Sequence, residues 1–194
     1  LDCRSSEFEY FPFDPVGYKL GLIDSVVKHE LVDSPYNKRR ASCENVARTL
    51  GVETLRDAEM ADLEKIKDRI SEEDYNRAVY VIGEKQRVLD VCDALQKGDY
   101  DTVGDRMYKT HEGMSKLYEV SCEELDYLND IAKECGVTGS RIMGGGFGGC
   151  TINLVKDDLY DSFIATAKEK FNARYGHEPV VYDVIVSDGA RRVE

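Results

Sequence analysis

The strongest constraint on the fold is the order of the secondary-structure signals, which places strand patterns at both ends of the chain and helix signals between them. Residues 7–13 alternate polar and aromatic side chains and residues 18–27 are largely apolar, so each predicts a strand. Near the other end, residues 151–155 and 179–186 predict two more strands, with a helix over 159–175 between them. The order predicts an α+β fold, in which helices pack on an antiparallel sheet layer and the long helical middle is an insertion between strands.

The helical block begins where serine and proline stand together, at Ser34 and Pro35. Serine is a favoured N-cap, proline is favoured in the first helical turn, and Gly51 supplies a left-handed stop. These signals predict a helix that ends at about the residue before Gly51. A short helical turn near residues 55–59 and a helix over 62–69 are expected to follow.

Three longer helical segments are predicted in the second half of the block. Ser71, followed by three acidic residues, starts the longest helix, which should end near Gly98. Residues 100–118 form another helical segment, although two glycines interrupt it. Ser121 with Glu124 three residues later has the pattern of a capping box, so Ser121 is the expected N-cap of the next helix.

The composition is that of an acidic globular chain. Lysine and arginine total 26 against 38 aspartates and glutamates, which gives a net charge of −12. Nucleic acid and anionic membrane surfaces both attract basic faces, so neither is an expected partner. No apolar run reaches the length of about 18 residues that a membrane span requires. With 194 residues the chain is long enough for one domain with its own core.

The six cysteines have neither zinc-site nor disulfide spacing. None stands in a CxxC pair, and no histidine is near enough in sequence to complete a zinc site. Buried, reduced thiols are the simplest interpretation, and they are typical of cytoplasmic proteins. The first residues do not have the pattern of a signal peptide. We therefore expect a cytoplasmic location.

Five glycines occupy six consecutive positions, from Gly144 to Gly149. They lose much conformational entropy on folding, so a compensating role is expected. Two interpretations stay open: backbone N–H groups approach ligand phosphates, or a tight loop passes beneath another element. The glycines match GxGxxG, but a dinucleotide site has a strand before and a helix after it, and here the signals predict a helix before and a strand after. Cys150 stands where a Walker A loop continues with lysine.

Residues Arg141–Cys150, which contain these glycines, resemble the third conserved motif of the galactokinases, a branch of the GHMP small-molecule kinases. Further runs resemble that family in the same order along the chain: Leu1–Ser5, Ser34–Arg40 followed by Cys43 and Glu44, Tyr118–Asp126, and Asp188–Ala190. The resemblance therefore spans nearly the whole chain.

The resemblance implies that residues 1–194 form a GHMP kinase C-terminal domain and that the N-terminal domain, which binds ATP and sugar, is absent from this chain. It implies transfer of the γ-phosphoryl group of ATP to the anomeric hydroxyl of galactose, with Mg²⁺. In that family the phosphate loop, the catalytic aspartate and the magnesium ligand all lie upstream of the position of Leu1. We therefore expect ATP and Mg²⁺ to be bound mainly by the N-terminal domain. No catalytic residue or metal ligand is expected in this chain, and the chain alone is expected to be inactive.

Tyr36 is the expected substrate residue, because the resemblance implies that a tyrosine at this place donates a hydrogen bond to the sugar. Without the resemblance, a packing tyrosine would be the simpler interpretation. The resemblance also implies that five glycines line the cleft between the domains and support the phosphate loop: Gly144, Gly145, Gly146, Gly148 and Gly149. Two alternatives stay open, a kinase for another monosaccharide such as N-acetylgalactosamine and a sugar sensor without turnover.

The remaining charged and histidine candidates are expected to be structural. Arg39 and Arg40 are expected to form ion pairs with nearby acids such as Glu44. His29 and His111 have no neighbouring nucleophile in the sequence, so they are interpreted as structural histidines rather than bases.

Two further positions near the expected site have local roles. Phe147 is expected to anchor the glycine loop in the core. Asp24 stands where the galactokinases usually have asparagine, and its carboxylate is expected to change a local hydrogen bond.

Overall fold

The computed structural model describes residues 1–27, 35–187 and 189. Its centre is an antiparallel sheet of four strands in the spatial order β2-β3-β1-β4. The strands are β1 (Tyr18–Asp24), β2 (Gly139–Ile142), β3 (Cys150–Lys156) and β4 (Val180–Val184). The predicted α+β class and the antiparallel sheet are therefore confirmed.

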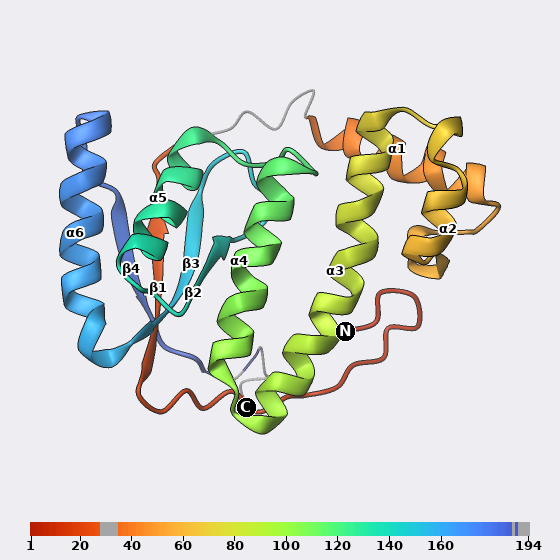
Figure 1. The fold of residues 1–194 in the computed structure, drawn as a ribbon. Coiled ribbons are helices and arrows are strands. Elements are labelled where there is room, and N and C mark those ends of the chain that lie inside the picture. Colours follow the sequence, from red (N-terminus) through yellow and green to blue (C-terminus); the bar gives the residue numbers. More distant parts are fainter. Residues whose placement is uncertain (28–34, 188, 190–194) are drawn as a thin grey trace, which may run out of the picture.

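Helices account for most of the remaining chain. They are α1 (Pro35–Leu50), α2 (Met60–Lys65), α3 (Glu72–Lys97), α4 (Tyr100–Lys116), α5 (Glu123–Glu134) and α6 (Asp157–Tyr175), with short 3₁₀ turns at Leu55–Asp57 and Lys67–Arg69. Five of these helices, α1 to α5, separate β1 from β2, so the helical middle is the expected insertion between strands. Figure 1 shows α3 and α4 side by side, with α1 crossing one end of α3 and α2 on the side of α3 that is away from the sheet.

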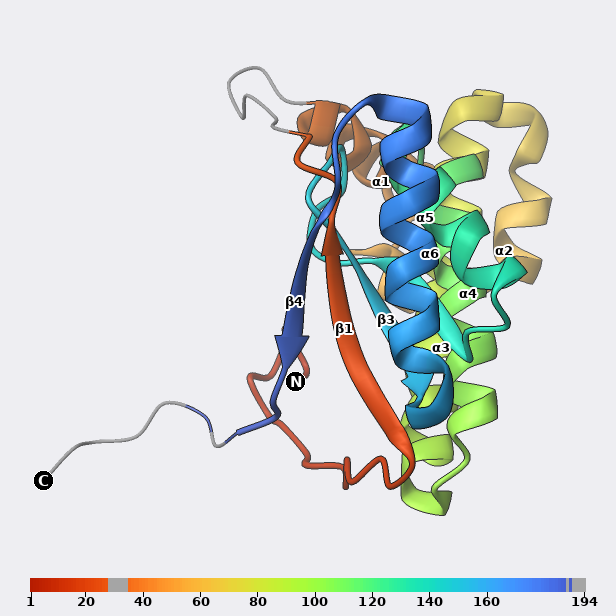
Figure 2. The ribbon, with the colours of Figure 1, turned by 90° about the vertical axis from the view of Figure 1, so that its left-hand side faces the viewer.

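One face of the sheet is covered by α5 and α6 (Figure 2). Ile23 of β1 and Val155 of β3 are fully buried there against Leu128 of α5 and against Phe163 and Phe171 of α6. Side chains of a strand alternate between its two faces, and the register of β1 with β3 places Ile23 and Val155 on the same face, the one that these helices cover. This core fixes the position of the sheet, and the sheet in turn positions the loops at its edge.

A second buried cluster joins the helices on the other side of the molecule. Val46 of α1, Leu63 of α2, and Ala78 and Ile82 of α3 are its central members. Burial of several aliphatic side chains is the main stabilising contribution to such helix packing. This cluster attaches the second half of α1 to α3.

Helix α4 approaches the sheet edge very closely at a pair of glycines. A Cβ on Gly104 of α4 would lie 2.0 Å from the carbonyl oxygen of Thr138, and one on Gly139 of β2 would lie 2.5 Å from the Cα of Gly104. Real Cβ atoms do not approach other atoms this closely. Helix and strand are therefore in backbone contact, which only glycine allows at these two positions.

Most predicted helix boundaries are confirmed. Ser71 accepts the N-cap hydrogen bond of α3 from the Asp74 N–H at 3.1 Å, and Gly98 ends that helix at φ +65°. Gly51 follows α1 with φ +76°. The predicted N-cap of α1, Ser34, lies outside the described residues.

Three predicted elements or caps before β2 are wrong. Residues 7–13 form no strand; Tyr10 is 87% exposed, and this segment pairs with no strand of the described sheet. The predicted helix over 62–69 is divided into α2 and a 3₁₀ turn. Ser121 does not cap α5: its hydroxyl donates to Asp126 at 2.5 Å, and Cys122 is the N-cap residue, without a side-chain hydrogen bond. In the third case a contact with Asp126 takes the serine hydroxyl that the capping pattern assigns to the helix backbone.

No helix in the part of the chain that the structure describes is long and apolar enough to cross a membrane.

Candidate functional site

The glycine loop, residues 143–149, joins β2 to β3 as a hairpin. The prediction that a helix precedes the loop is wrong, because β2 has only four residues and is too short to give a clear alternating pattern. Gly144, Gly146, Gly148 and Gly149 have φ angles of +83°, +83°, +139° and +78°. Residues with a Cβ rarely adopt such angles, so the backbone geometry itself requires most of these glycines.

The glycine loop lies against the bend, residues 117–120 between α4 and α5. The N–H of Phe147 donates to the carbonyl of Val120 at 2.6 Å, and a Cβ on Gly146 would lie 2.0 Å from that carbonyl oxygen. The Phe147 ring packs against the buried cluster that contains Val120 and Ile142, which agrees with its expected anchoring role. At Gly146 the structure thus supports close passage beneath another segment, the second of the two interpretations.

The end of β1 closes the other side of the glycine loop. Both the N–H and the hydroxyl of Ser25 donate to the carbonyl of Gly149, each at 2.9 Å. Asp24 accepts from the N–H of Val26 at 2.8 Å, a local hydrogen bond that the side-chain oxygen of an asparagine would also accept. Val26 has φ +62°, a strained angle for a β-branched residue.

Backbone strain is concentrated around this loop. Three of the four residues other than glycine with positive φ in the described chain lie here: Val26 at +62°, Glu119 at +54° and Phe147 at +61°. Each such angle costs free energy, about 1–3 kcal/mol, and persists only where surrounding contacts enforce it. Strained residues gather at functional sites more often than elsewhere, so this region is the candidate site.

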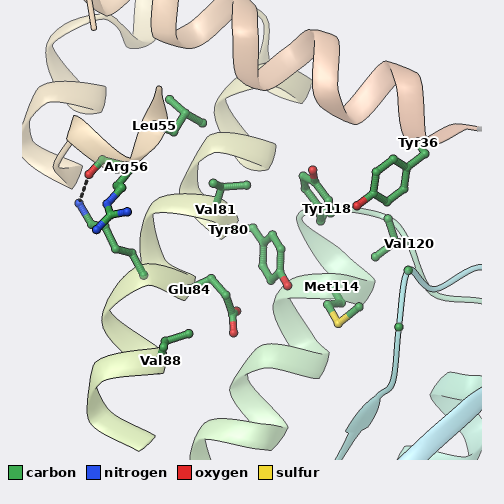
Figure 3. Close-up of a pocket in the computed structure, with 13 residues that line it drawn as sticks. Tyr36, Leu55, Arg56, Tyr80, Val81, Glu84, Val88, Met114, Tyr118 and Val120 are labelled. Carbon is green, nitrogen blue, oxygen red and sulfur yellow. Dashed lines mark hydrogen bonds between the residues drawn. The ribbon is translucent and has the colours of Figure 1, made fainter. Parts of the chain in front are cut away.

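A cavity of about 440 Å³ opens beside the glycine loop (Figure 3). Tyr36 from the first turn of α1 stands on one side, and Gly144 and Gly145 form part of the wall. The ring of Tyr36 lies 3.8 Å from the place where a Cβ on Gly145 would be. Tyr36 is 54% exposed, so it is not buried as a packing tyrosine would be. The structure therefore brings together Tyr36 and the first two glycines of the loop.

The opposite wall of the cavity comes from α3. Figure 3 shows Tyr80 of α3 and Tyr118 of the bend near Tyr36, with Glu84 one turn beyond Tyr80. Burial raises the pKa of Tyr80 and that of Tyr118, so both phenols stay protonated. Glu84 accepts from the Thr110 hydroxyl at 2.8 Å. The cavity is thus an aromatic recess with phenol groups at its wall.

These residues of α3 and of the bend carry no local sequence signal of a place at the cavity. Tyr80 and Glu84 are four residues apart, so the sequence predicts that they lie on the same face of a helix and close to each other. Nothing in the local pattern places that face opposite Tyr36, because the approach of α3 to α1 depends on the buried cluster between them.

The two arginines after Tyr36 have different roles. Arg40 pairs on the surface with Glu44, at 2.8 Å, as predicted. Arg39 is only 7% exposed; its guanidinium donates to carbonyl oxygens of the bend and forms an ion pair with Glu119 at 3.8 Å, so the expected pairing with an acid is present but the acid is not Glu44. His29 lies outside the described residues.

Asp126 holds the bend to α4 and α5. Its carboxylate accepts from the hydroxyls of Ser115 at 2.8 Å and Ser121 at 2.5 Å, and its Oδ1 lies 3.1 Å from Nε2 of His111. His111 is buried there and has a structural contact, as expected. Partial burial raises the pKa of Asp126, but the hydrogen bonds from His111, Ser121 and Ser115 outweigh it and lower the pKa to about 2.

Replacing Asp126 with asparagine is expected to lower the melting temperature of the chain at pH 7 but much less at pH 2. A carboxyl whose folded-state pKa is depressed stabilises the fold above its unfolded pKa and loses that contribution as pH falls through the folded value. The Asp126 contribution is therefore present above about pH 4 and is largely lost near pH 2. Melting curves of both proteins between pH 7 and pH 2 measure the difference.

The control is Asp130→Asn, which changes an exposed aspartate one turn further along α5. Its melting temperature should follow that of the wild type at every pH. A gap between wild type and Asp126→Asn that stayed constant from pH 7 to pH 2 would contradict the assignment of the low pKa to Asp126.

A metal site in this chain would need several oxygen, nitrogen or sulfur donors close together. Among residues 1–27, 35–187 and 189, no three histidine, cysteine, aspartate or glutamate side chains stand together as metal ligands. Glu84 is the one carboxylate among the residues that line the cavity, and it accepts the hydrogen bond from the Thr110 hydroxyl.

The chain was compared with curated proteins. It is 39% identical over 194 residues to a galactokinase of Thermotoga neapolitana, covering all of this chain and 54% of that protein. It is 40% identical over 192 residues to a human galactokinase, covering 98% of this chain and 48% of that protein. The chain thus spans about half the length of the curated relatives it matches.

Solved structures give the same result. The crystal structure of Lactococcus lactis galactokinase complexed with galactose superposes with a TM-score of 0.91 at 26% identity, over all of this chain and 51% of that one. A mevalonate kinase of L. major, at 19% identity and a TM-score of 0.55, shares the fold. Residues 92–173 match the family described as GHMP kinases C terminal. Residues 92–173 therefore carry a GHMP kinase C-terminal domain, and the chain as a whole is similar to about half the length of the galactokinases.

Proposed function

We propose that this chain forms, as one domain over residues 1–194, the part of a galactokinase that closes the sugar site beside the ATP site. The activity of the whole protein would be transfer of the γ-phosphoryl group of ATP to the anomeric hydroxyl of galactose. The observation that carries this proposal is the cavity in which Tyr36 faces Gly144 and Gly145. The matched relatives are galactokinases, so the comparisons do not favour the alternatives of another sugar or a sensor without turnover.

In this proposal Tyr36 binds and orients the sugar. Its ring is half exposed at the start of α1, and its side chain lines a cavity large enough for one monosaccharide. A phenol both donates and accepts hydrogen bonds, which suits a sugar hydroxyl. Fixing the acceptor hydroxyl relative to the phosphoryl group is a large part of catalysis in phosphoryl transfer.

The glycine loop has two tasks in the proposal. Gly144 and Gly145 leave the cavity wall without side chains, so a ligand can approach the backbone. Gly146 and Phe147 attach the loop to the bend and keep this wall in place. ATP and Mg²⁺ would be bound mainly by the part of a galactokinase that this chain does not cover.

A cytoplasmic location is part of the same proposal. All six cysteines are free in the structure, and such thiols persist in a reducing compartment. ATP, the proposed phosphoryl donor, is abundant there.

The proposed function is tested with a protein of the relatives' full length that contains this chain. Galactose, N-acetylgalactosamine and glucose are offered separately with ATP, and ADP formation is measured. We expect turnover with galactose well above that with the other two sugars. The 194-residue chain by itself is expected to give none, and sugar-independent ADP formation alone would refute the proposal.

Tyr36→Phe in that protein is expected to weaken the use of galactose and to leave the use of ATP unchanged. The change removes one hydroxyl and keeps the ring. A neutral hydrogen bond contributes about 0.5–1.5 kcal/mol, so KM for galactose should rise roughly two- to twelvefold. Steady-state kinetics with each substrate varied in turn measure both KM values. A fall in kcat would show that Tyr36 also aligns the reacting hydroxyl.

Tyr182→Phe is the matched control, because Tyr182 is a similarly exposed tyrosine on β4 that does not line this cavity. It should leave both KM values unchanged. If Tyr36→Phe behaved like this control, Tyr36 would be a packing residue without a part in sugar binding.

A further inference from the structure

Arg39 is a buried cation one helical turn after Tyr36. Residues three apart on a helix lie on the same face, so the two side chains leave α1 in similar directions. Arg39 is 7% exposed, whereas Tyr36 is 54% exposed. A charged side chain that is buried this far needs partners for its donors, and its partners show what it holds together.

The guanidinium of Arg39 is hydrogen-bonded to the bend. Its Nε donates to the carbonyl of Tyr118 at 2.9 Å and its Nη2 donates to the carbonyl of Glu119 at 2.5 Å. The two bonds come from one edge of a planar group, which matches two neighbouring carbonyls better than a lysine ammonium would. Glu119 has a strained φ of +54°, so Arg39 is one of the contacts that enforce this angle.

The same guanidinium contacts the glycine loop. It lies over the ring of Phe147, 5.3 Å from the ring centroid. Phe147 in turn donates its N–H to Val120 of the bend. The start of α1, the bend and the glycine loop therefore meet at Arg39.

The bend and the glycine loop have further attachments to the rest of the fold. Asp126 holds Ser115 and Ser121 on either side of the bend, and Ser25 holds Gly149 at the end of the loop. If the guanidinium were lost, these contacts would keep bend and loop in place. The segment left free to shift would be the first turn of α1, which carries Tyr36.

We propose that Arg39 is a positioning residue for the sugar site, which fixes the start of α1 to the bend and the glycine loop and so sets the place of the Tyr36 hydroxyl in the cavity. This inference rests on the proposed function of Tyr36. Arg39 does not line the cavity and acts through Tyr36.

The kinetic test uses Arg39→Lys in the full-length protein, with Arg40→Lys as the matched control on the surface. Arg39→Lys keeps the charge but loses the planar fork. KM for galactose is expected to rise by up to the effect of Tyr36→Phe, roughly two- to twelvefold, with KM for ATP unchanged. In the double variant Tyr36→Phe/Arg39→Lys the second change should add less than about twofold, because both act on the same hydroxyl. Independent, multiplying effects would overturn the proposal.

A second measurement on the 194-residue chain does not depend on sugar turnover. The chain has no tryptophan, so Tyr36→Trp introduces a single tryptophan at the site, which is excited at wavelengths that the tyrosines do not absorb. Adding Arg39→Lys is expected to shift its emission to longer wavelength and to increase its quenching by acrylamide, whereas adding Arg40→Lys should change neither. Identical spectra for both additions would overturn the positioning role.

The two measurements separate the inference from the proposed function. If the full-length protein has no galactose-dependent activity, the proposed function fails and the fluorescence still decides about Arg39. If Arg39→Lys lowers the folded fraction, Phe147→Leu replaces it, since this change removes the ring beneath the guanidinium. The same red shift supports the proposal, and an unchanged spectrum overturns it.

Discussion

Replacing Gly146 with alanine in the full-length protein is expected to lower galactose-dependent turnover about a hundredfold, the size of loss that a displacement of about 1 Å causes at a reacting centre. The new Cβ would lie 2.0 Å from the carbonyl oxygen of Val120, and backbone cannot rotate away as a side chain can. The loop must therefore move off the bend, and the wall formed by Gly144 and Gly145 moves with it. Steady-state kinetics and a thermal melt of the same preparation measure activity and stability together.

Gly149→Ala is the matched control for this prediction. Gly149 lies in the same loop with a similar φ of +78° and does not line the cavity, and a Cβ on it would have no other atom within 4 Å. Both variants bear the strain of a left-handed alanine, and only Gly146→Ala adds the collision. Equal losses in the two variants would mean that backbone strain alone accounts for the effect and that contact with the bend is unimportant.

For the glycine loop, a close approach of the backbone could be predicted from the sequence, but its partner could not. The run of glycines predicted a backbone that approaches something closely, and that is confirmed at Gly146. The partner of this approach could not be predicted, because Val120 is 26 residues away in the chain and reaches the loop only through the hairpin and the α4–α5 connection. The short strand β2 before the loop was missed for a related reason, since four residues carry too little pattern.

The arginines after Tyr36 illustrate a second limit. Arg39 and Arg40 are adjacent and chemically identical, and a glutamate four residues after Arg40 indicated a surface pair correctly. Burial of Arg39 depends on where the bend passes α1, and no local pattern contains that information. In contrast, helix boundaries such as Ser71 and Gly98 were predictable, because caps act within one turn.

Gly104→Ala in the 194-residue chain is expected to give a large loss of stability. An alanine in a helix interior is usually about 0.5–1 kcal/mol more favourable than glycine, so propensity alone predicts a gain. The Cβ, however, would lie 2.0 Å from the Thr138 carbonyl oxygen and 2.9 Å from its methyl group, where α4 contacts β2. Overpacking of this kind costs about 1–3 kcal/mol or more, which corresponds to a melting temperature lower by roughly 2–12 °C in a chain of this size.

Gly83→Ala tests the same substitution in a helix without the contact to backbone. Gly83 lies inside α3, and the nearest atom to its Cβ would be the end of the flexible Arg87 side chain, at 3.2 Å. That side chain can move, so the helix propensity of alanine should dominate and the melting temperature should stay the same or rise by a few degrees. The opposite signs of the two changes would separate close backbone packing from helix propensity. A rise in melting temperature for both variants would show that α4 can withdraw from β2 at no cost, and that the glycine pair is not needed to hold helix and sheet together.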